Sequence, residues 1–119
     1  MSDAFYTDKL LTHYHAPENY GLRDGLDLEA RGDNPLCGDT IVMRLKIEND
    51  RITDVCFEGQ GCVISKASTS LLTEYIKGKK IEEIGVLDMK FMIDLLGITP
   101  MPARLKCVLL PLETVQKMI

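Results

Sequence analysis

The sequence predicts an α+β fold, in which a small antiparallel sheet of about three strands has helices packed on one face. Two observations favour it. Apolar and polar residues alternate in the middle of the chain, which is typical of half-buried strands, and apolar residues recur every three to four positions after it, which is typical of helices. With 119 residues the chain is expected to form a single domain, residues 1–119, that buries its own core.

The N-terminal half is predicted to contain one helix and then strands. Residues 4–15 form a short helix that Pro17 ends, because proline cannot continue a helix. Three strands are predicted, over residues 26–31, 41–48 and 51–58. Asn49 and Asp50 tolerate positive φ, so the second and third strands are expected to form a hairpin.

The C-terminal half is predicted to be helical. A helix follows Gly61, and Gly78 is a suitable stop for it. One or two short helices are expected over 80–96, ending at Gly97. The last helix is predicted to begin at Pro102. It carries an apolar stripe made of Leu105, Val108, Leu112, Val115 and Ile119.

A proline lies inside the last predicted helix. Pro111 has no N–H to donate to the carbonyl of Cys107, four residues earlier, and its ring crowds that carbonyl. We therefore expect a kink or break at residues 108–111, with the freed carbonyl beside the thiol.

Composition narrows the class of protein. The net charge of −4 and the sequence pI of about 5.1 argue against nucleic acid as the main partner. No apolar run approaches the roughly 18 residues of a membrane span, and no secretory signal opens the chain. The expected compartment is cytoplasmic, with no membrane partner. Because thiols stay reduced there, the four cysteines are expected to be ligands, nucleophiles or core residues instead of disulfides.

Two cysteines lie where predicted elements begin. Cys37 lies in a turn before a strand, where Gly38 allows a close backbone approach and Asp39 can supply an oxygen to the same ion. Ordinary turn chemistry explains residues 34–39 equally well. Cys62 lies where a glycine loop enters a helix, whose dipole stabilises a thiolate. The alternative for Cys62 is a small buried residue at a helix start.

The other two cysteines have different surroundings. Cys107 lies early in the last helix beside Arg104 and Lys106, whose charges would favour a thiolate and attract an anionic partner. The alternative is a core cysteine with two solvated charges nearby. Cys56 lies on the polar face of its strand and is expected to be a structural bystander.

Three thiols and one carboxylate from separate elements could form a tetrahedral site. Zinc accepts such a ligand set, and so does an iron–sulfur cluster. His13 and His15 are expected to be non-ligands, and no C-x-x-C pair is present. The residues alone therefore predict a thiolate metal site and leave the metal open.

Three segments of the chain resemble the cysteine motifs of the IscU/SufU iron–sulfur scaffold family, which includes the N-terminal domain of NifU. They are NPLCGD (34–39), FEGQGCVISKASTSLLTEYIKGK (57–79) and PARLKCVLL (102–110). Tyr6 and HYHAPENYG (13–21) are similar to that family's N-terminal signature. The likeness spans nearly the whole chain.

The resemblance implies a cytoplasmic platform that binds iron, builds a [2Fe–2S] cluster and passes it to recipient apo-proteins. It implies that Cys37, Cys62 and Cys107 are ligand thiols, with Asp39 as the acid beside the first. It also implies a PLP-dependent cysteine desulfurase as partner, with Cys107 as the sulfur acceptor, which should then be exposed and anionic. Asp39, as a weaker oxygen ligand, would make the cluster labile. A homodimer is among the expected assemblies.

The motifs combine two branches of this family. IscU-type members have a histidine directly before the third cysteine, where this chain has Lys106. Arg104, three residues before that cysteine, instead resembles the arginine of the SufU branch. SufU-type proteins are regarded as zinc-dependent sulfur acceptors. The insertion that SufU-type proteins carry between the second and third cysteines is absent. The preferred function is therefore a scaffold that is not an enzyme, and the alternative is a Zn²⁺-dependent sulfur acceptor for a desulfurase. A structural zinc domain without sulfur chemistry is the third reading.

Overall fold

The computed structural model describes residues 7–119. In chain order the elements are α1 (Asp8–His15), β1 (Leu28–Asn34), β2 (Asp39–Glu48), β3 (Arg51–Gln60), α2 (Val63–Ile76), α3 (Ile81–Gly85), α4 (Met89–Leu96), the 3₁₀ turn η1 (Pro102–Arg104) and α5 (Leu105–Gln116). The helix α1 ends at His15 as predicted and begins at Asp8, capped by Thr7. Residues 4–6 of the predicted helix, including Tyr6 of the N-terminal signature, lie outside the described residues.

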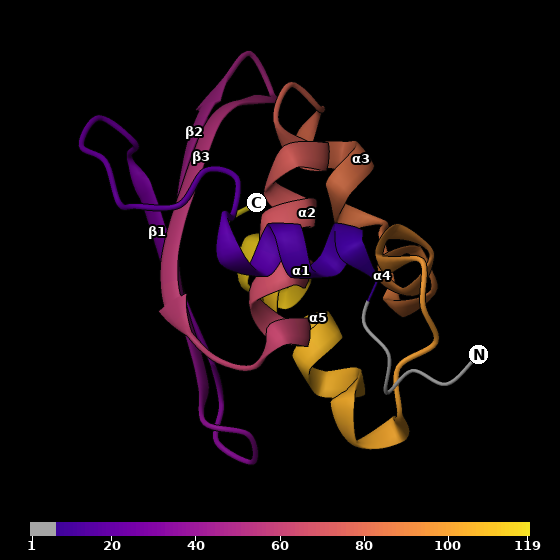
Figure 1. Ribbon diagram of the computed structural model, residues 1–119. Coiled ribbons are helices and arrows are strands. Elements are labelled where there is room, and N and C mark those ends of the chain that lie inside the picture. The colour runs from indigo at the N-terminus through magenta and orange to yellow at the C-terminus, as the bar shows by residue number, and fades with distance from the viewer. Residues whose placement is uncertain (1–6) are drawn as a thin grey trace.

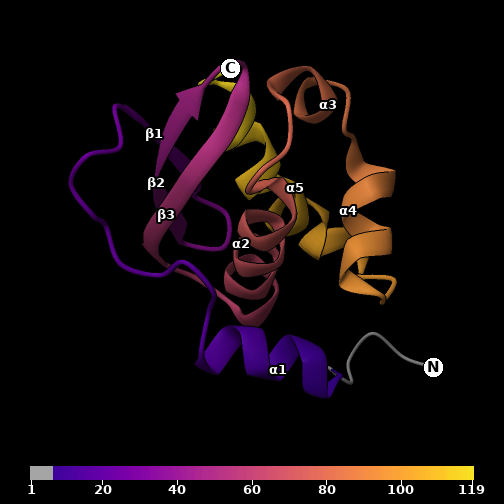
Figure 2. The same cartoon turned by 90° about the horizontal axis from the view of Figure 1, so that it is seen from above.

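The three strands form one antiparallel sheet in the order β1-β2-β3. All helices lie on one side of this sheet (Figure 1), which confirms the predicted α+β architecture. Seen from above, α2 runs through the middle, between the sheet and α4 (Figure 2). The core therefore forms between the inner face of the sheet and a layer of helices centred on α2.

Two hairpins set the shape of the sheet. Asn49 and Asp50 adopt φ values of 52° and 63°, which confirms the predicted turn between β2 and β3. The first strand begins later than predicted and continues to Asn34, where it pairs with Asp39. The segment NPLCGD is therefore the tip of a hairpin, with residues 35–38 as its turn.

The central helix α2 is buried on more than its predicted face. Ile64 and Leu71 are buried as expected, but so is the polar side, including Ser70. The Oγ of Ser70 lies 2.6 Å from Nδ1 of His13 and accepts the main-chain N–H of Glu18. The hydroxyl of Ser70 is therefore satisfied inside the protein by α1 and the loop after it, whereas Oγ of Ser68, also buried in α2, has no hydrogen-bond partner among residues 7–119.

The predicted break in the last helix is wrong, and the alternative, a kink at residues 108–111, stays a prediction. Helix α5 runs without a break from Leu105 to Gln116 with Pro111 inside it. Proline removes one hydrogen bond, to the carbonyl of Cys107, whereas Leu110 and Leu112 on either side of it are buried in the core. Packing on both sides therefore holds the helix together. The short turn before it starts with Pro102, at the predicted place.

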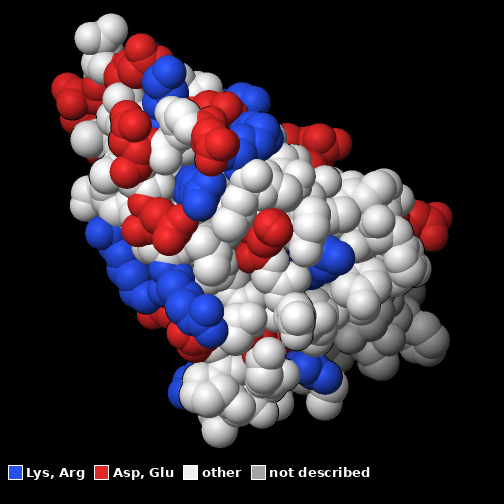
Figure 3. Space-filling model, turned by 90° about the vertical axis from the view of Figure 1, so that its left-hand side faces the viewer, with Lys and Arg blue, Asp and Glu red and all other residues white. Residues whose placement is uncertain are grey.

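The outer face of the sheet carries charges of both signs (Figure 3). Arg44 pairs with Glu29 at 2.8 Å and Arg23 with Asp54 at 2.7 Å. Beneath these charges Cys56 is fully buried, and its sulfur accepts the main-chain N–H of Arg23 at 3.4 Å. Among residues 7–119, no helix has both the length and the apolar character needed to cross a membrane.

Candidate metal centre

Three candidate ligand atoms, two from the β1–β2 hairpin and one from helix α5, gather at one end of the molecule. The sulfurs of Cys37 and Cys107 and a carboxylate oxygen of Asp39 all lie within 4.8 Å of one another. The β1–β2 turn and the start of α5 both lie toward the lower end of the molecule in Figure 1. Ligands bound at about 2.3 Å in a tetrahedral site lie roughly 3.8 Å apart. The group is therefore close to the spacing that a single metal ion requires.

The hairpin turn places Cys37 at the surface end of this group. The N–H of Cys37 donates to the carbonyl of Asn34 at 3.2 Å, which closes the turn. Gly38 follows with φ +72°, a left-handed conformation that glycine adopts without strain. The thiol of Cys37 is partly exposed, so this ligand is the one that solvent can reach most directly.

Asp39 is completely buried, and its two carboxylate oxygens differ. Oδ1 accepts the N–H of Cys62 at 3.1 Å. Oδ2 has no hydrogen-bond partner among residues 7–119. A buried carboxylate oxygen without a partner is costly unless a cation or donor satisfies it. The donor chemistry therefore fits a bound metal ion.

Gly61 makes room for this carboxylate. A Cβ atom at Gly61 would lie 2.6 Å from Oδ1 of Asp39 and 2.9 Å from Oγ of Ser65. The close approach of the loop to Asp39 thus requires glycine. From the sequence, Gly61 is expected only in a loop before a helix, because nothing in the local pattern shows which side chain the loop approaches.

Cys107 faces inward instead of outward. It is fully buried, and Nδ2 of Asn34 lies 3.6 Å from its sulfur. Burial raises the pKa of the Cys107 thiol, and the nearby Asp39 carboxylate and Cys37 thiol raise it further. The expectation of an exposed, anionic Cys107 is therefore wrong for this structure, because α5 packs the residue against the core. Coordination to a metal ion would favour its thiolate form.

Cys62 lies next to the group but its sulfur is outside it. Cys62 is the N-cap of α2, and its sulfur accepts the N–H of Ser65 at 3.4 Å. It contacts the site through its own N–H, which is bonded to Asp39. The structure thus brings three of the four predicted ligands together, and ligation by Cys62 stays a prediction.

The two basic residues near Cys107 differ in their placement. Arg104 lies close to the thiols, and the proximity of Cys62 first and of Cys107 second raises its pKa. Lys106 is exposed, and within residues 7–119 no hydrogen bond or ion pair joins it to the group. Arg104 can therefore act on the site directly, whereas Lys106 lies at its margin.

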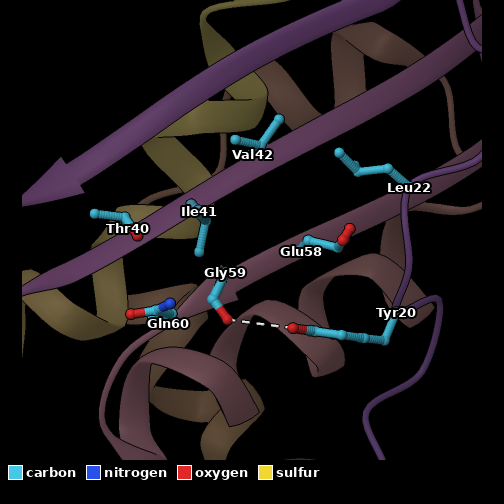
Figure 4. A pocket seen from close by; sticks show the side chains of 8 residues that line it. All are labelled: Tyr20, Leu22, Thr40, Ile41, Val42, Glu58, Gly59 and Gln60. Carbon is cyan, nitrogen blue, oxygen red and sulfur yellow. Dashed lines mark hydrogen bonds between the residues drawn. The ribbon is translucent and has the colours of Figure 1, made fainter.

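Two hollows adjoin this end of the molecule. A groove of about 380 Å³ lies between the hairpin turn and α5, lined by Asp33, Asn34, Pro35, Leu36, Lys106, Leu109, Leu110 and Glu113. A second hollow, of about 370 Å³, is lined by Tyr20, Leu22, Thr40, Ile41, Val42, Glu58, Gly59 and Gln60 (Figure 4). Its lining contains no thiol, and the hydroxyl of Tyr20 closes one side by donating to the carbonyl of Gly59 at 3.3 Å. This second hollow is therefore separate from the metal centre.

Comparisons with known proteins agree with the fold. A family model described as the NifU-like N terminal domain matches residues 5–119. The zinc-dependent sulfurtransferase SufU of Bacillus subtilis is 34% identical, and the match covers 97% of this chain and 89% of that protein. The iron–sulfur cluster assembly scaffold protein IscU of Aquifex aeolicus is 38% identical, with coverage of 92% and 70%. A crystal structure of a candidate scaffold protein for the SUF system from Fervidobacterium islandicum superposes with a TM-score of 0.85 at 28% identity, covering 99% of this chain and 98% of that one.

Proposed function

Since this chain belongs to the NifU-like N-terminal domain family, we propose that it is a scaffold for iron–sulfur cluster assembly. It accepts sulfur from a cysteine desulfurase, binds iron and passes a labile [2Fe–2S] cluster to apo-proteins. The relatives named as scaffolds support this function, and so does the donor set of the site.

One observation carries the proposal: two thiols and a buried carboxylate with an unpartnered oxygen converge from three elements. We propose Cys37, Asp39, Cys62 and Cys107 as the residues that hold the metal. Thiolates suit iron in a cluster, whereas a carboxylate is a harder and weaker ligand for it. Only one oxygen of Asp39 is available, because the other is bonded to Cys62. The bond between the carboxylate of Asp39 and iron would therefore be the weakest one in the site, and the cluster would be released most easily there.

The burial of Cys107 suggests an order for sulfur transfer. A thiolate at Cys37, which is partly exposed, attacks the outer sulfur of the desulfurase persulfide, and the desulfurase thiolate leaves. Cys107 in turn attacks the persulfide on Cys37, whose sulfur is within 4.8 Å, and the thiolate of Cys37 leaves. Cys107 can then accept the sulfur although its thiol is buried.

Mass spectrometry after incubation with the desulfurase and cysteine tests this order. The variant Cys107→Ser should still acquire one extra sulfur, on Cys37, whereas Cys37→Ser should acquire none on Cys107. Cys56→Ser, whose thiol lies under the outer face of the sheet, is the matched control. Labelling of Cys107 in Cys37→Ser would contradict the order.

Metal analysis after anaerobic reconstitution tests the function itself. With desulfurase, cysteine and ferrous iron, the protein should turn brown and contain iron and sulfide in equal amounts. Cys37→Ser should lose most of the visible absorption, and Cys56→Ser should keep it. A parent protein that stays colourless and holds one tight zinc ion would reject the scaffold function.

That second outcome corresponds to the other candidate function, a zinc-dependent sulfur acceptor. Arg104 favours it, because its guanidinium lies close to the thiols and Lys106 stands where IscU-type members have a histidine. The 34% identity to SufU over 97% of the chain supports it as well. In that case the same thiols and Asp39 would hold Zn²⁺, and the protein would be a sulfurtransferase.

A further inference from the structure

We propose that Asn34 is a positioning residue of the metal centre. Its side-chain amide donates an N–H···S hydrogen bond to Cys107, orients this ligand and withdraws charge from the metal-bound thiolate. The inference rests on the proposed function, since it takes Cys107 to be a ligand. Asn34 itself would not bind the metal, and it would act on the metal through its contacts with Cys107 and Cys37.

Asn34 adjoins every member of the three-ligand group through a different atom. Its Nδ2 lies 3.6 Å from the sulfur of Cys107. Its carbonyl accepts the N–H of Cys37 at 3.2 Å, and its partner across the hairpin is Asp39. A single residue at the end of β1 therefore fixes the turn that carries Cys37 and contacts the helix that carries Cys107.

The polar side chain at this position points to a role beyond packing. Asn34 is only 5% exposed, and its other surroundings in the groove include the apolar Leu109 and Leu110. A buried amide group is costly unless its N–H groups find acceptors. An apolar side chain of the same size would fill the space without that cost. The amide is thus best explained by the sulfur that it faces.

A metal-bound sulfur makes this hydrogen bond stronger. A thiol sulfur is a weak acceptor, whereas a thiolate bears negative charge and accepts a charge-assisted bond. The bond therefore stabilises Cys107 more with metal than without it. Hydrogen bonds to ligand sulfurs also help to set the reduction potential of a cluster. Because a reduced cluster is more negative, this bond should raise the potential.

Zinc affinity, measured by competition with a chromophoric chelator, provides the main test. Asn34→Leu removes the donor at nearly constant size, and Asn34→Ala removes it without adding a charge or a new metal ligand. Both variants should bind zinc about 10- to 100-fold more weakly than the parent, the usual effect of losing such a partner. The cobalt-loaded forms should also show a shifted sulfur-to-cobalt absorption band.

Thr114→Val is the matched control. The hydroxyl of Thr114 donates to the carbonyl of Leu110 at 2.8 Å and lies against Gly32 at the same β1–α5 contact. Thr114→Val removes this buried hydrogen bond and leaves the proposed metal ligands unchanged. This control should lower the free energy of unfolding and leave zinc affinity and the cobalt band unchanged.

The outcomes separate this inference from the proposed function. A parent protein that fails to bind zinc would reject the metal site, whereas equal affinity in the parent and a folded Asn34→Leu would reject only the role of Asn34. If Asn34→Leu does not fold, Asn34→Ala decides in the same way. Cadmium-113 NMR of the parent needs no variant: scalar coupling between cadmium and an amide proton of Asn34 is expected, and its absence would contradict the bond.

Discussion

At the scale of single residues, the carboxylate of Asp39 shows most clearly how the site could hold a metal and still release it. One oxygen is fixed by the N–H of Cys62 and the other has no partner within residues 7–119. The hydrogen bond from Cys62 thus orients the carboxylate of Asp39, and its second oxygen stays available as one weak donor to the metal. A fourth thiolate there would bind a soft metal more tightly.

Removing this carboxylate should lengthen the lifetime of a reconstituted cluster. In Asp39→Ala the weakest ligand is gone, so we expect the visible absorption to decay several-fold more slowly in air than in the parent. Asp33→Ala is the control, because Asp33 is exposed and its one ion pair within residues 7–119 is with Arg31 on the surface. Equal decay of Asp39→Ala and the parent would contradict the account of lability.

The buried thiol of Cys107 predicts a pH dependence of the metal-free protein. Its pKa is raised in the folded state, so folding stabilises the protonated thiol. This contribution is complete below the pKa of an unfolded cysteine, about 8.5, and is lost as the pH rises above that value. The free energy of unfolding from urea titrations should therefore fall more steeply between pH 8 and about pH 10 for the parent than for Cys107→Ser. Parallel pH profiles would contradict a buried neutral thiol.

At the scale of elements, the loop between β3 and α2 determines where the carboxylate lies. Gly61→Ala would place a methyl group 2.6 Å from Oδ1 of Asp39. We expect a loss of about 1–3 kcal/mol in the free energy of unfolding and weaker zinc binding, since the carboxylate must move. Gly85→Ala in α3, where a Cβ meets nothing within 4 Å, should change neither quantity. If Gly61→Ala bound zinc as tightly as the parent, the packing of this loop would not matter to the site.

The contact of α1 with α2 depends on one buried hydroxyl. Ser70 is bonded to His13 and to the N–H of Glu18, so Ser70→Ala leaves both groups without their partner. The expected cost is about 1–3 kcal/mol, measured by urea unfolding. Thr12→Ala on the exposed side of α1 is the control and should stay within about 0.5 kcal/mol of the parent. A neutral Ser70→Ala would mean that α1 is held by other contacts.

The elements show which features local sequence can and cannot predict. Alternation and turn chemistry correctly predicted the β2–β3 hairpin, because Asn49 and Asp50 determine their own backbone conformation. The first strand was placed too early, because its pairing with β2 depends on the partner strand and not on its own pattern. The break at Pro111 was predicted from one lost hydrogen bond, and the packing of α5 on both sides outweighed it.

At the scale of the whole molecule, the fold assembles a site from residues that are far apart in the chain. Cys37, Asp39 and Cys107 were identified as candidates from motifs, and the structure brings them together. Distances between such residues depend on tertiary packing, so the sequence left open whether Cys107 is an exposed thiol or a core cysteine, and the structure confirms the core position. The sequence also could not predict that Asn34 faces Cys107. It also could not predict that the sulfur of Cys62 caps α2 instead of joining the group.

X-ray absorption spectroscopy of the zinc-loaded parent and of three single variants tests the central claim most directly. The parent should show a first shell of sulfur at about 2.3 Å together with oxygen at about 2.0 Å. Cys37→Ser and Cys107→Ser should each lose one sulfur from that shell, and Cys56→Ser should match the parent. A shell that is unchanged in the first two variants, or that loses a sulfur in Cys56→Ser, would show that the metal binds elsewhere.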